Sequence, residues 1–338
     1  MDPRSDAAAP PSEPETEPTS GQATDLPTEL TYDLPINLPS DLPTELPSDA
    51  RTDGSSEPAA VPPPVFPPGR EIELPGRGTT FVRELHGPTE DAPTLLLLHG
   101  WTATADLNFF TCYHELARTY HVLALDHRGH GRGMRTKRFR LEDCADDAVA
   151  LLDVRGIDKA IVVGYSMGGP VALLAWRQHP ERVRGLVLCA TAPCFSTSRV
   201  ERLNFLGLTG LATLSRATPG KARQWLTEQL YLQRKTVAWD PWAIEEVSQH
   251  DWRTILEAGR RIGAFSALDW LGEIDVPVSV VITMRDQVVP LRRQILLFEG
   301  IPGAEAFRVD GQHDAVVART PAFLPMLERA CLSVRERS

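Results

Sequence analysis

The sequence predicts an α/β fold with a doubly wound, mostly parallel sheet, an inserted helical cap and a disordered N-terminal tail. After about residue 69, short and wholly apolar runs such as 94–98 and 160–163 alternate with longer helical patterns. Strands that are apolar on both faces are typical of a parallel sheet covered by helices. Before residue 69, proline and acidic residues replace this alternation.

Residues 1–68 form the predicted tail, which contains 16 of the 29 prolines. The tail to residue 64 has a net charge of -11 while the whole chain has -10, so the remainder is nearly neutral. An Asp-Leu-Pro motif recurs every eight residues, starting at Asp25, Asp33 and Asp41. Dense proline and like charges favour an extended, disordered spacer. A docking tail that orders on a protein partner is the alternative.

The composition of the rest of the chain excludes several classes of function. No basic stripe with interleaved aromatic residues is present, so we expect no nucleic-acid partner. The 5 cysteines are widely spaced, and no histidine cluster has metal-ligand spacing. This pattern predicts buried free thiols, no metal and no cofactor. Without an apolar leader or a run long enough to cross a bilayer, we expect no membrane span and a cytoplasmic location, while the oligomeric state stays open.

The predicted elements follow one another along residues 69–338. The predicted strands are 71–74, 80–86, 94–98, 121–125, 160–163, 183–188, 278–282 and 306–309. Helical patterns lie at 109–119, 142–155 and 169–179, and a closing helix begins near Pro321. The alternation stops near Pro193 and resumes at Pro277. Residues 195–274, which are mostly helical in pattern, are therefore predicted to form a cap inserted into the domain.

The segment Gly164-Tyr165-Ser166-Met167-Gly168 has the pattern Gly-x-Ser-x-Gly. Chance alone supplies this pattern in about one chain in ten of this length. Its position is more informative, because an apolar strand at 160–163 turns directly into the helical pattern at 169–179. Such a turn strains the backbone of the serine and raises its hydroxyl above the sheet edge, where flanking glycines avoid collisions. We predict that Ser166 is a catalytic nucleophile.

A serine nucleophile needs a base, and the base needs an acid to orient it. Asp286 follows the strand 278–282 and lies at its carboxyl end, the edge where ligands bind in such sheets. Asp275 precedes that strand and lies at the wrong edge. His313 follows the last strand, 306–309. We therefore predict that His313 is the general base and Asp286 its orienting acid.

Ester cleavage places negative charge on the former carbonyl oxygen, which backbone N–H groups can stabilise. The residue after the nucleophile, Met167, is one predicted donor. The loop after the strand 94–98 reads His99-Gly100-Trp101, and Trp101 is the second predicted donor. The Trp101 side chain adds an apolar wall or packs at the sheet edge.

From about residue 69 onward the chain resembles the α/β-hydrolase superfamily with an inserted helical cap. The resemblance rests on the segment 99–101, on the turn around Ser166 and on the chain order of Ser166, Asp286 and His313. It implies a serine hydrolase with a catalytic triad and an oxyanion hole. The segment 126–131 also resembles a family loop that is usually structural, so no catalytic role is assigned to it.

Two residues depart from the family pattern. Gln312 immediately precedes the predicted catalytic histidine, and Thr283 follows the strand 278–282; members often have glycine at both places. These residues alter the two loops without removing a functional group.

The nature of the substrate is predicted from the nucleophile and the cap. Serine rather than aspartate in the turn argues against haloalkane dehalogenases and epoxide hydrolases. Five of the 7 tryptophans lie in the cap, at positions 225, 239, 242, 252 and 270, which favours an apolar acyl or aromatic small molecule or else attaches the cap to the sheet. We predict hydrolysis of a carboxylic ester through an acyl-enzyme. The alternatives are a cofactor-free perhydrolase resembling the non-haem haloperoxidases, a carbon–carbon bond hydrolase, and a non-catalytic receptor or scaffold.

Overall fold

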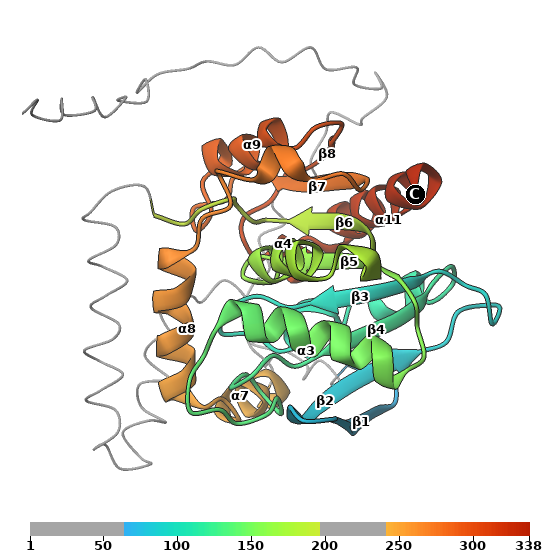
Figure 1. Ribbon diagram of the computed structural model, residues 1–338, viewed down its shortest axis with the longest axis vertical. Helices are drawn as coiled ribbons and strands as arrows, with labels where there is room; N and C mark the ends of the chain where they lie inside the picture. The colour runs from blue at the N-terminus through green and yellow to red at the C-terminus, as the bar shows by residue number, and fades with distance from the viewer. Residues whose placement is uncertain (1–63, 197–240) are drawn as a thin grey trace, which may run out of the picture. The chain divides into compact units, whose positions relative to one another are not determined.

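The computed structural model describes residues 64–196 and 241–338 (Figure 1). The predicted tail up to residue 63, with its Asp-Leu-Pro repeat, lies outside the described residues. So do residues 197–240, which make up about half of the predicted cap.

An eight-stranded sheet has the strand order β1-β2-β4-β3-β5-β6-β7-β8. The strands are β1 (Gly69–Leu74), β2 (Gly78–Leu85), β3 (Thr94–Leu98), β4 (His121–Leu125), β5 (Ala160–Tyr165), β6 (Val183–Cys189), β7 (Val278–Thr283) and β8 (Glu305–Val309). The pairs β1–β2 and β2–β4 are antiparallel, and every other neighbouring pair is parallel. The predicted mostly parallel sheet is confirmed.

Helices cover both faces of this sheet. The described α-helices are α1 (Ala105–Phe109), α2 (Tyr113–Leu116), α3 (Leu141–Val154), α4 (Gly168–Gln178), α7 (Pro241–Ser248), α8 (Trp252–Ala264), α9 (Leu291–Gly300), α10 (Ala315–Ala318) and α11 (Thr320–Arg337). Two 3₁₀ turns, η1 (Pro180–Arg182) and η2 (Leu271–Glu273), precede β6 and β7. No described helix is long and apolar enough to cross a membrane.

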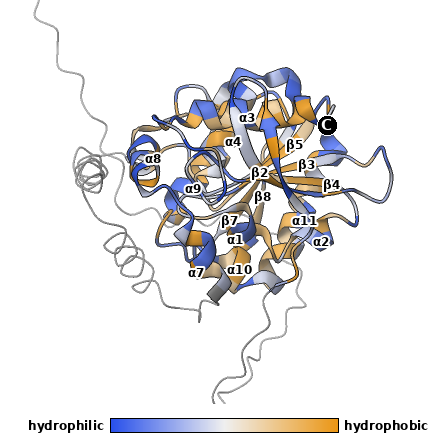
Figure 2. Cartoon of the chain, turned by 90° about the horizontal axis from the view of Figure 1, so that it is seen from below, coloured by the Kyte–Doolittle hydropathy of each residue, from blue (hydrophilic) through white to orange (hydrophobic). Residues whose placement is uncertain are grey.

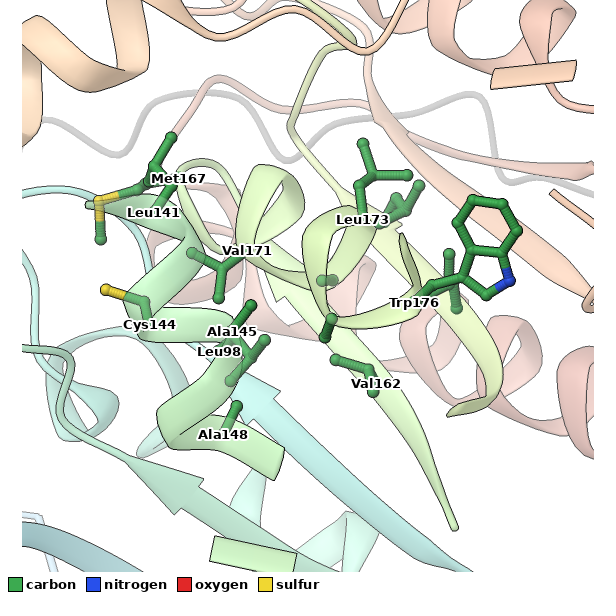
Figure 3. Close-up of a cluster of buried hydrophobic side chains, with 14 of the residues drawn as sticks. Leu98, Leu141, Cys144, Ala145, Ala148, Val162, Met167, Val171, Leu173 and Trp176 are labelled. Carbon is green, nitrogen blue, oxygen red and sulfur yellow. The ribbon is translucent and has the colours of Figure 1, made fainter. Parts of the chain in front are cut away.

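Alternate side chains of the central strands enter two separate apolar layers. Leu96, Leu98 and Val162 pack with α3 and α4 on one face of the sheet (Figure 3). Leu95 and Leu97 point to the other face, where α1, α2, α10 and α11 cover them. Figure 2 shows the apolar strands at the centre, surrounded by helices whose outer surfaces are more hydrophilic. This alternation explains why the strand sequences are apolar throughout.

The predicted helix 109–119 is two short helices, α1 and α2, in the structure. The break falls at residues 110–112. There the hydroxyl of Thr111 donates to the carbonyl of Val316 in α10 (Oγ1–O distance 3.0 Å). This contact ties the break to a helix more than 200 residues later in the chain, which local sequence patterns do not reveal.

The carboxyl ends of the parallel strands meet at one edge of the sheet. The three described non-glycine residues with positive φ, Thr102, Ser166 and Ala190, come just after β3, β5 and β6. These three strands are neighbours in the sheet. Because such conformations cost about 1–3 kcal/mol each and gather at functional sites, this edge is the place to look for a site.

Candidate active site

Ser166 occupies the sharp turn between β5 and α4, with φ 52°. Its N–H donates to the carbonyl of Cys189 on β6 (2.9 Å), and its carbonyl accepts from the hydroxyl of Thr191 (2.7 Å) and from the N–H of Gly169 (2.9 Å). These hydrogen bonds hold the strained serine between two neighbouring strands.

Glycines on both sides of Ser166 make this turn possible. A Cβ on Gly164 would collide with the carbonyl of Gly168, and one on Gly168 would collide with the carbonyl of Leu98. Helix α4 can therefore begin directly against the ends of β3 and β5 only because these positions lack a side chain.

The structure brings three of the predicted site residues into one hydrogen-bonded chain. The Oγ of Ser166 lies 3.0 Å from Nε2 of His313, and Nδ1 of His313 lies 2.8 Å from Oδ2 of Asp286. A carboxylate accepts hydrogen bonds, so Nδ1 carries the proton and Nε2 is left to accept the serine proton. Ser166 and Asp286 are only 9% and 6% exposed, which limits competition from water.

The carboxylate of Asp286 is held by donors on both of its oxygens. Oδ1 accepts from the N–H groups of Val288 and Val289, each at 2.8 Å. Oδ2 accepts from the hydroxyl of Thr283 at 2.8 Å in addition to His313. These hydrogen bonds fix the orientation of the carboxylate, so that Oδ2 faces the imidazole of His313.

The two predicted backbone donors flank the serine. Met167 follows Ser166 at the start of α4, and its side chain is fully buried in the layer drawn in Figure 3. Trp101 follows Gly100, where an added Cβ would meet the Cβ of Ser166 at 3.2 Å. Within the described residues, the backbone N–H groups of Met167 and Trp101 have no hydrogen-bond acceptor. Both are therefore available to an oxygen bound beside Ser166.

The sequence profile of the family described as "alpha/beta hydrolase fold" matches residues 93–317. The chain belongs to this family. Among curated proteins it is 27% identical to the "Putative carbamate hydrolase RutD" of Agrobacterium fabrum, over 71% of this chain and 94% of that protein. It is 34% identical to Epoxide hydrolase B of Mycobacterium tuberculosis, over 30% of this chain and 29% of that protein.

Solved structures share the fold of this α/β hydrolase. An enol-lactonase from Burkholderia xenovorans LB400 matches with a TM-score of 0.66 and 21% identity, covering 78% of this chain and 100% of that one. A bromoperoxidase from Bacillus anthracis matches with a TM-score of 0.65 and 16% identity, covering 78% and 99%. At these identities the likeness concerns the fold alone.

The structure accounts for both departures of this α/β hydrolase from the family pattern. Thr283 donates its hydroxyl to the Asp286 carboxylate, so the larger residue adds a hydrogen bond to the site. Gln312 is exposed, and its side chain leaves the imidazole of His313 in contact with Ser166. The hydroxyl of Tyr165 donates to the His313 carbonyl (2.5 Å) and so fixes the loop that contains His313.

The described part of the cap, α7 and α8, is attached next to this site. The indole N–H of Trp101 donates to the carbonyl of Ile255 on α8 (2.8 Å). His250 accepts from the N–H of Gly131 through Nδ1 (2.7 Å), and the N–H of Asp251 donates to the carbonyl of Gly129 (2.9 Å). Figure 1 shows α8 standing beside the ends toward which β3, β5 and β6 point. Trp101 thus joins the cap to the loop that carries a predicted backbone donor.

The three described cap tryptophans pack against protein. Trp252 is buried in an apolar cluster between the cap and α1, where Trp242 also packs. Trp270 stacks on Trp176 of α4, with ring centroids 6.2 Å apart. These contacts favour the attaching role over an apolar substrate wall. Trp225 and Trp239 lie outside the described residues.

The segment 126–131 forms a buried polar support behind the site. Asp126 accepts from the N–H groups of Ala105 (2.9 Å) and Arg132 (3.0 Å), and burial raises the pKa of its carboxyl to about 7. Its location and contacts fit the structural role that the resemblance implies for this loop. All five cysteines are buried and none forms a disulfide, as the sequence predicts.

One group of described residues has atoms close enough together for a metal ion: Glu84, His86 and His121, at the amino end of β4. Glu84 accepts hydrogen bonds from Arg155 (2.7 Å) and Arg70 (2.6 Å) and contacts His121 (3.1 Å). Two guanidinium groups on one carboxylate disfavour a cation there, so we interpret the group as an ion-pair network.

Sequence reasoning missed Thr283, Tyr165, His99 and Asn108 as residues that support the site. Thr283 ends β7 three positions before Asp286, and that spacing was the available signal. Asn108, whose Oδ1 accepts from the N–H of Gly100, carried no such signal. This contact depends on the position of α1 in the fold.

Proposed function

We propose that this protein is a serine hydrolase that cleaves a carboxylic ester through an acyl-enzyme formed on Ser166. The observation that carries the proposal is the continuous chain from Ser166 Oγ to His313 Nε2 (3.0 Å) and from His313 Nδ1 to Asp286 (2.8 Å). A weak nucleophile, a base in the correct tautomer and a buried anion are thereby aligned.

In the acylation step, Ser166 Oγ attacks the ester carbonyl while His313 Nε2 takes the serine proton. The carbonyl oxygen becomes negatively charged and receives hydrogen bonds from the N–H groups of Trp101 and Met167. His313 then gives its proton to the leaving alcohol as the carbon–oxygen bond breaks. Asp286 stays ionised throughout and stabilises the imidazolium.

In the deacylation step, His313 removes a proton from a water molecule that attacks the acyl carbonyl. The same two N–H groups stabilise the second tetrahedral intermediate. Its collapse returns the proton from His313 to Ser166 and releases the carboxylic acid, so the enzyme is regenerated without a cofactor.

The substrate class rests on the nucleophile more firmly than on the cap. Ser166 occupies the turn, so the attacking group is a hydroxyl and the intermediate is an ester between Ser166 and the acyl group. Hydrolysis of that ester then releases the product acid. The described tryptophans are used in packing, so an apolar acyl or aromatic group in the substrate remains a prediction from composition.

The direct test is turnover of short p-nitrophenyl esters by the wild-type chain and by Ser166→Ala. We expect the variant to lose about 10⁴-fold or more in kcat, because the nucleophile is gone. Thermal unfolding controls for folding; alanine keeps the Cβ and the turn, and only the hydrogen bond to His313 is lost, so we expect the stability to change by about 1 kcal/mol at most. Undiminished turnover by a folded Ser166→Ala protein would remove the proposal.

A further inference from the structure

The position of the Trp101 N–H depends on the backbone of Gly100. Glycine imposes little restraint on its own φ and ψ, so something else must hold this residue. Both of its backbone polar groups are held by side chains. The N–H of Gly100 donates to Oδ1 of Asn108 (2.7 Å), and the carbonyl of Gly100 lies 2.8 Å from Nδ1 of His99.

The hydrogen bond from His99 has a defined direction. Nε2 of His99 accepts from the N–H of His127 (2.9 Å), so the proton of the neutral ring resides on Nδ1 and points to the Gly100 carbonyl. His99 is fully buried, and burial holds its pKa well below the usual value, which keeps it neutral. The Gly100 carbonyl and the Trp101 N–H belong to one planar peptide unit, so fixing the first orients the second.

The hydrogen bond to Asn108 fixes the peptide unit on the other side of Gly100. An amide nitrogen cannot accept from an N–H, so Oδ1 must face Gly100. Asn108 belongs to α1, a short helix anchored by the buried Asp106. That carboxylate accepts from Arg83 and Arg132, each at 2.7 Å, and from Tyr113 at 3.2 Å. The acceptor is therefore presented from a fixed helix.

We propose that Asn108 is a positioning residue that holds Gly100 so that the Trp101 N–H faces the oxygen bound at Ser166. The proposal rests on the proposed function. Gly100 lies beside the nucleophile, because a Cβ added there would lie 3.2 Å from Ser166 Cβ and 3.4 Å from Asn108 Oδ1. Without the Asn108 acceptor, the N–H side of Gly100 is released. The remaining contacts act beyond it: His99 and the N–H of Ala103 (3.4 Å) on the Gly100 carbonyl, and the indole of Trp101 on Ile255.

The test compares Asn108→Leu, which has a similar shape but no acceptor, with the wild type. The readout is the second-order rate of Ser166 phosphonylation by a fluorophosphonate, followed by intact mass, because the phosphonyl oxygen occupies the place of the carbonyl oxygen. We expect a 10- to 100-fold slower reaction, the range typical of a displaced catalytic donor. With a p-nitrophenyl ester, kcat should fall by a similar factor while KM changes less than threefold.

Thr104→Val is the matched control on the same helix. Thr104 caps α1 by accepting from the N–H of Leu107 (3.1 Å), and its hydroxyl donates to Glu246 of α7 (3.1 Å) rather than to Gly100. We expect it to lower the melting temperature while keeping phosphonylation within threefold of the wild-type rate. Equal slowing by Thr104→Val and Asn108→Leu would show that Asn108 acts only through helix stability.

Two further variants separate the possible failures. Asn108→Ala should slow phosphonylation in the same direction and replaces Asn108→Leu if that variant does not fold. Ser166→Ala should not react at all. A wild-type rate for both Asn108 variants beside an inert Ser166→Ala overturns the role of Asn108 alone, whereas an unreactive wild type overturns the proposed function and this proposal together.

Discussion

At the scale of single residues, the candidate site depends on holding one strained serine in place. A φ of 52° is unfavourable for serine by about 1–3 kcal/mol, and neighbouring hydrogen bonds to Cys189 and Thr191 oppose its relaxation. The same restraint places Oγ at 3.0 Å from Nε2 of His313. The turn therefore has two effects: it strains the backbone of Ser166 and it aligns the Ser166 hydroxyl with His313.

Asp286→Asn tests the tautomer of His313. An amide retains the shape but can present an N–H to the ring, which favours the proton on Nε2 and removes its ability to accept from Ser166. We expect kcat for ester hydrolysis to fall by about 10³–10⁴-fold with the fold intact. Asp310→Asn is the control, because Asp310 pairs with the neighbouring Arg285 on the surface (2.7 Å). A decrease below tenfold for Asp286→Asn, or an equal decrease for the control, would contradict the role of Asp286.

Sequence alone pointed to the three residues that we propose carry the chemistry but not to those that support them. Ser166, Asp286 and His313 each follow a strand whose apolar pattern is recognisable, and the topology brings such strand ends to one edge. Asn108 reaches Gly100 because of the buried contacts that anchor α1. Those contacts join segments far apart in the chain, so no local pattern predicts them.

At the scale of elements, the chain that precedes β1 packs against α7 of the cap. The ring of Phe66 lies edge-on to Trp242 of α7, with centroids 5.2 Å apart, and the Arg83 guanidinium lies over it at 5.0 Å. The carbonyl of Pro67 accepts from Arg83 (2.6 Å). The anchored part of the domain thus begins before Gly69.

Two truncations distinguish this anchor from the rest of the N-terminal segment. Removing residues 1–68 deletes Phe66 and Pro67, whereas removing residues 1–63 keeps them. We expect the longer deletion to melt about 2–4 °C below the shorter one, because the lost aromatic contact stabilises by about 1 kcal/mol. Phe66→Ala in the shorter truncation should reproduce most of the difference. Identical melting temperatures for all three proteins would show that Phe66 does not fasten α7.

At the scale of the whole molecule, four buried histidines lie between the sheet and the cap: His99, His127, His130 and His250. Burial lowers the pKa of all four, to about 3 for His127 and about 4 for His250. The unfolded chain binds protons at these residues below about pH 6.5, while the folded chain does not until far lower pH. Their contribution to stability is therefore complete above pH 6.5 and is lost as the pH falls toward 4.

His127→Phe isolates one of these contributions. Neither ring nitrogen of His127 has a hydrogen-bond partner among the described residues, so phenylalanine removes no bond. Between pH 7 and pH 5 we expect the wild type to lose about 2 kcal/mol more unfolding free energy than the variant. Asp126, whose raised pKa of about 7 acts in the opposite direction, cancels in this comparison. Urea unfolding at both pH values provides the measurement, and equal losses would contradict a neutral, buried His127.

The fold as a whole was predictable because its central strands, such as β3 and β5, are apolar on both faces and alternate with helical patterns. The order of the strands in the sheet was not, since the position of β4 between β2 and β3 depends on pairing between distant segments. The role of the cap tryptophans could not be predicted from composition either. Three of those that favoured a substrate wall, Trp242, Trp252 and Trp270, pack against protein.

Trapping the acyl-enzyme tests the central claim most directly. The wild-type chain is mixed with excess p-nitrophenyl ester, quenched in acid within the first turnovers and analysed by intact mass and peptide mapping. We predict one added acyl group, located on the peptide that contains Ser166 and absent from Ser166→Ala. An acyl group on another residue, or active turnover by a folded protein that never carries an acyl group at Ser166, would contradict the mechanism.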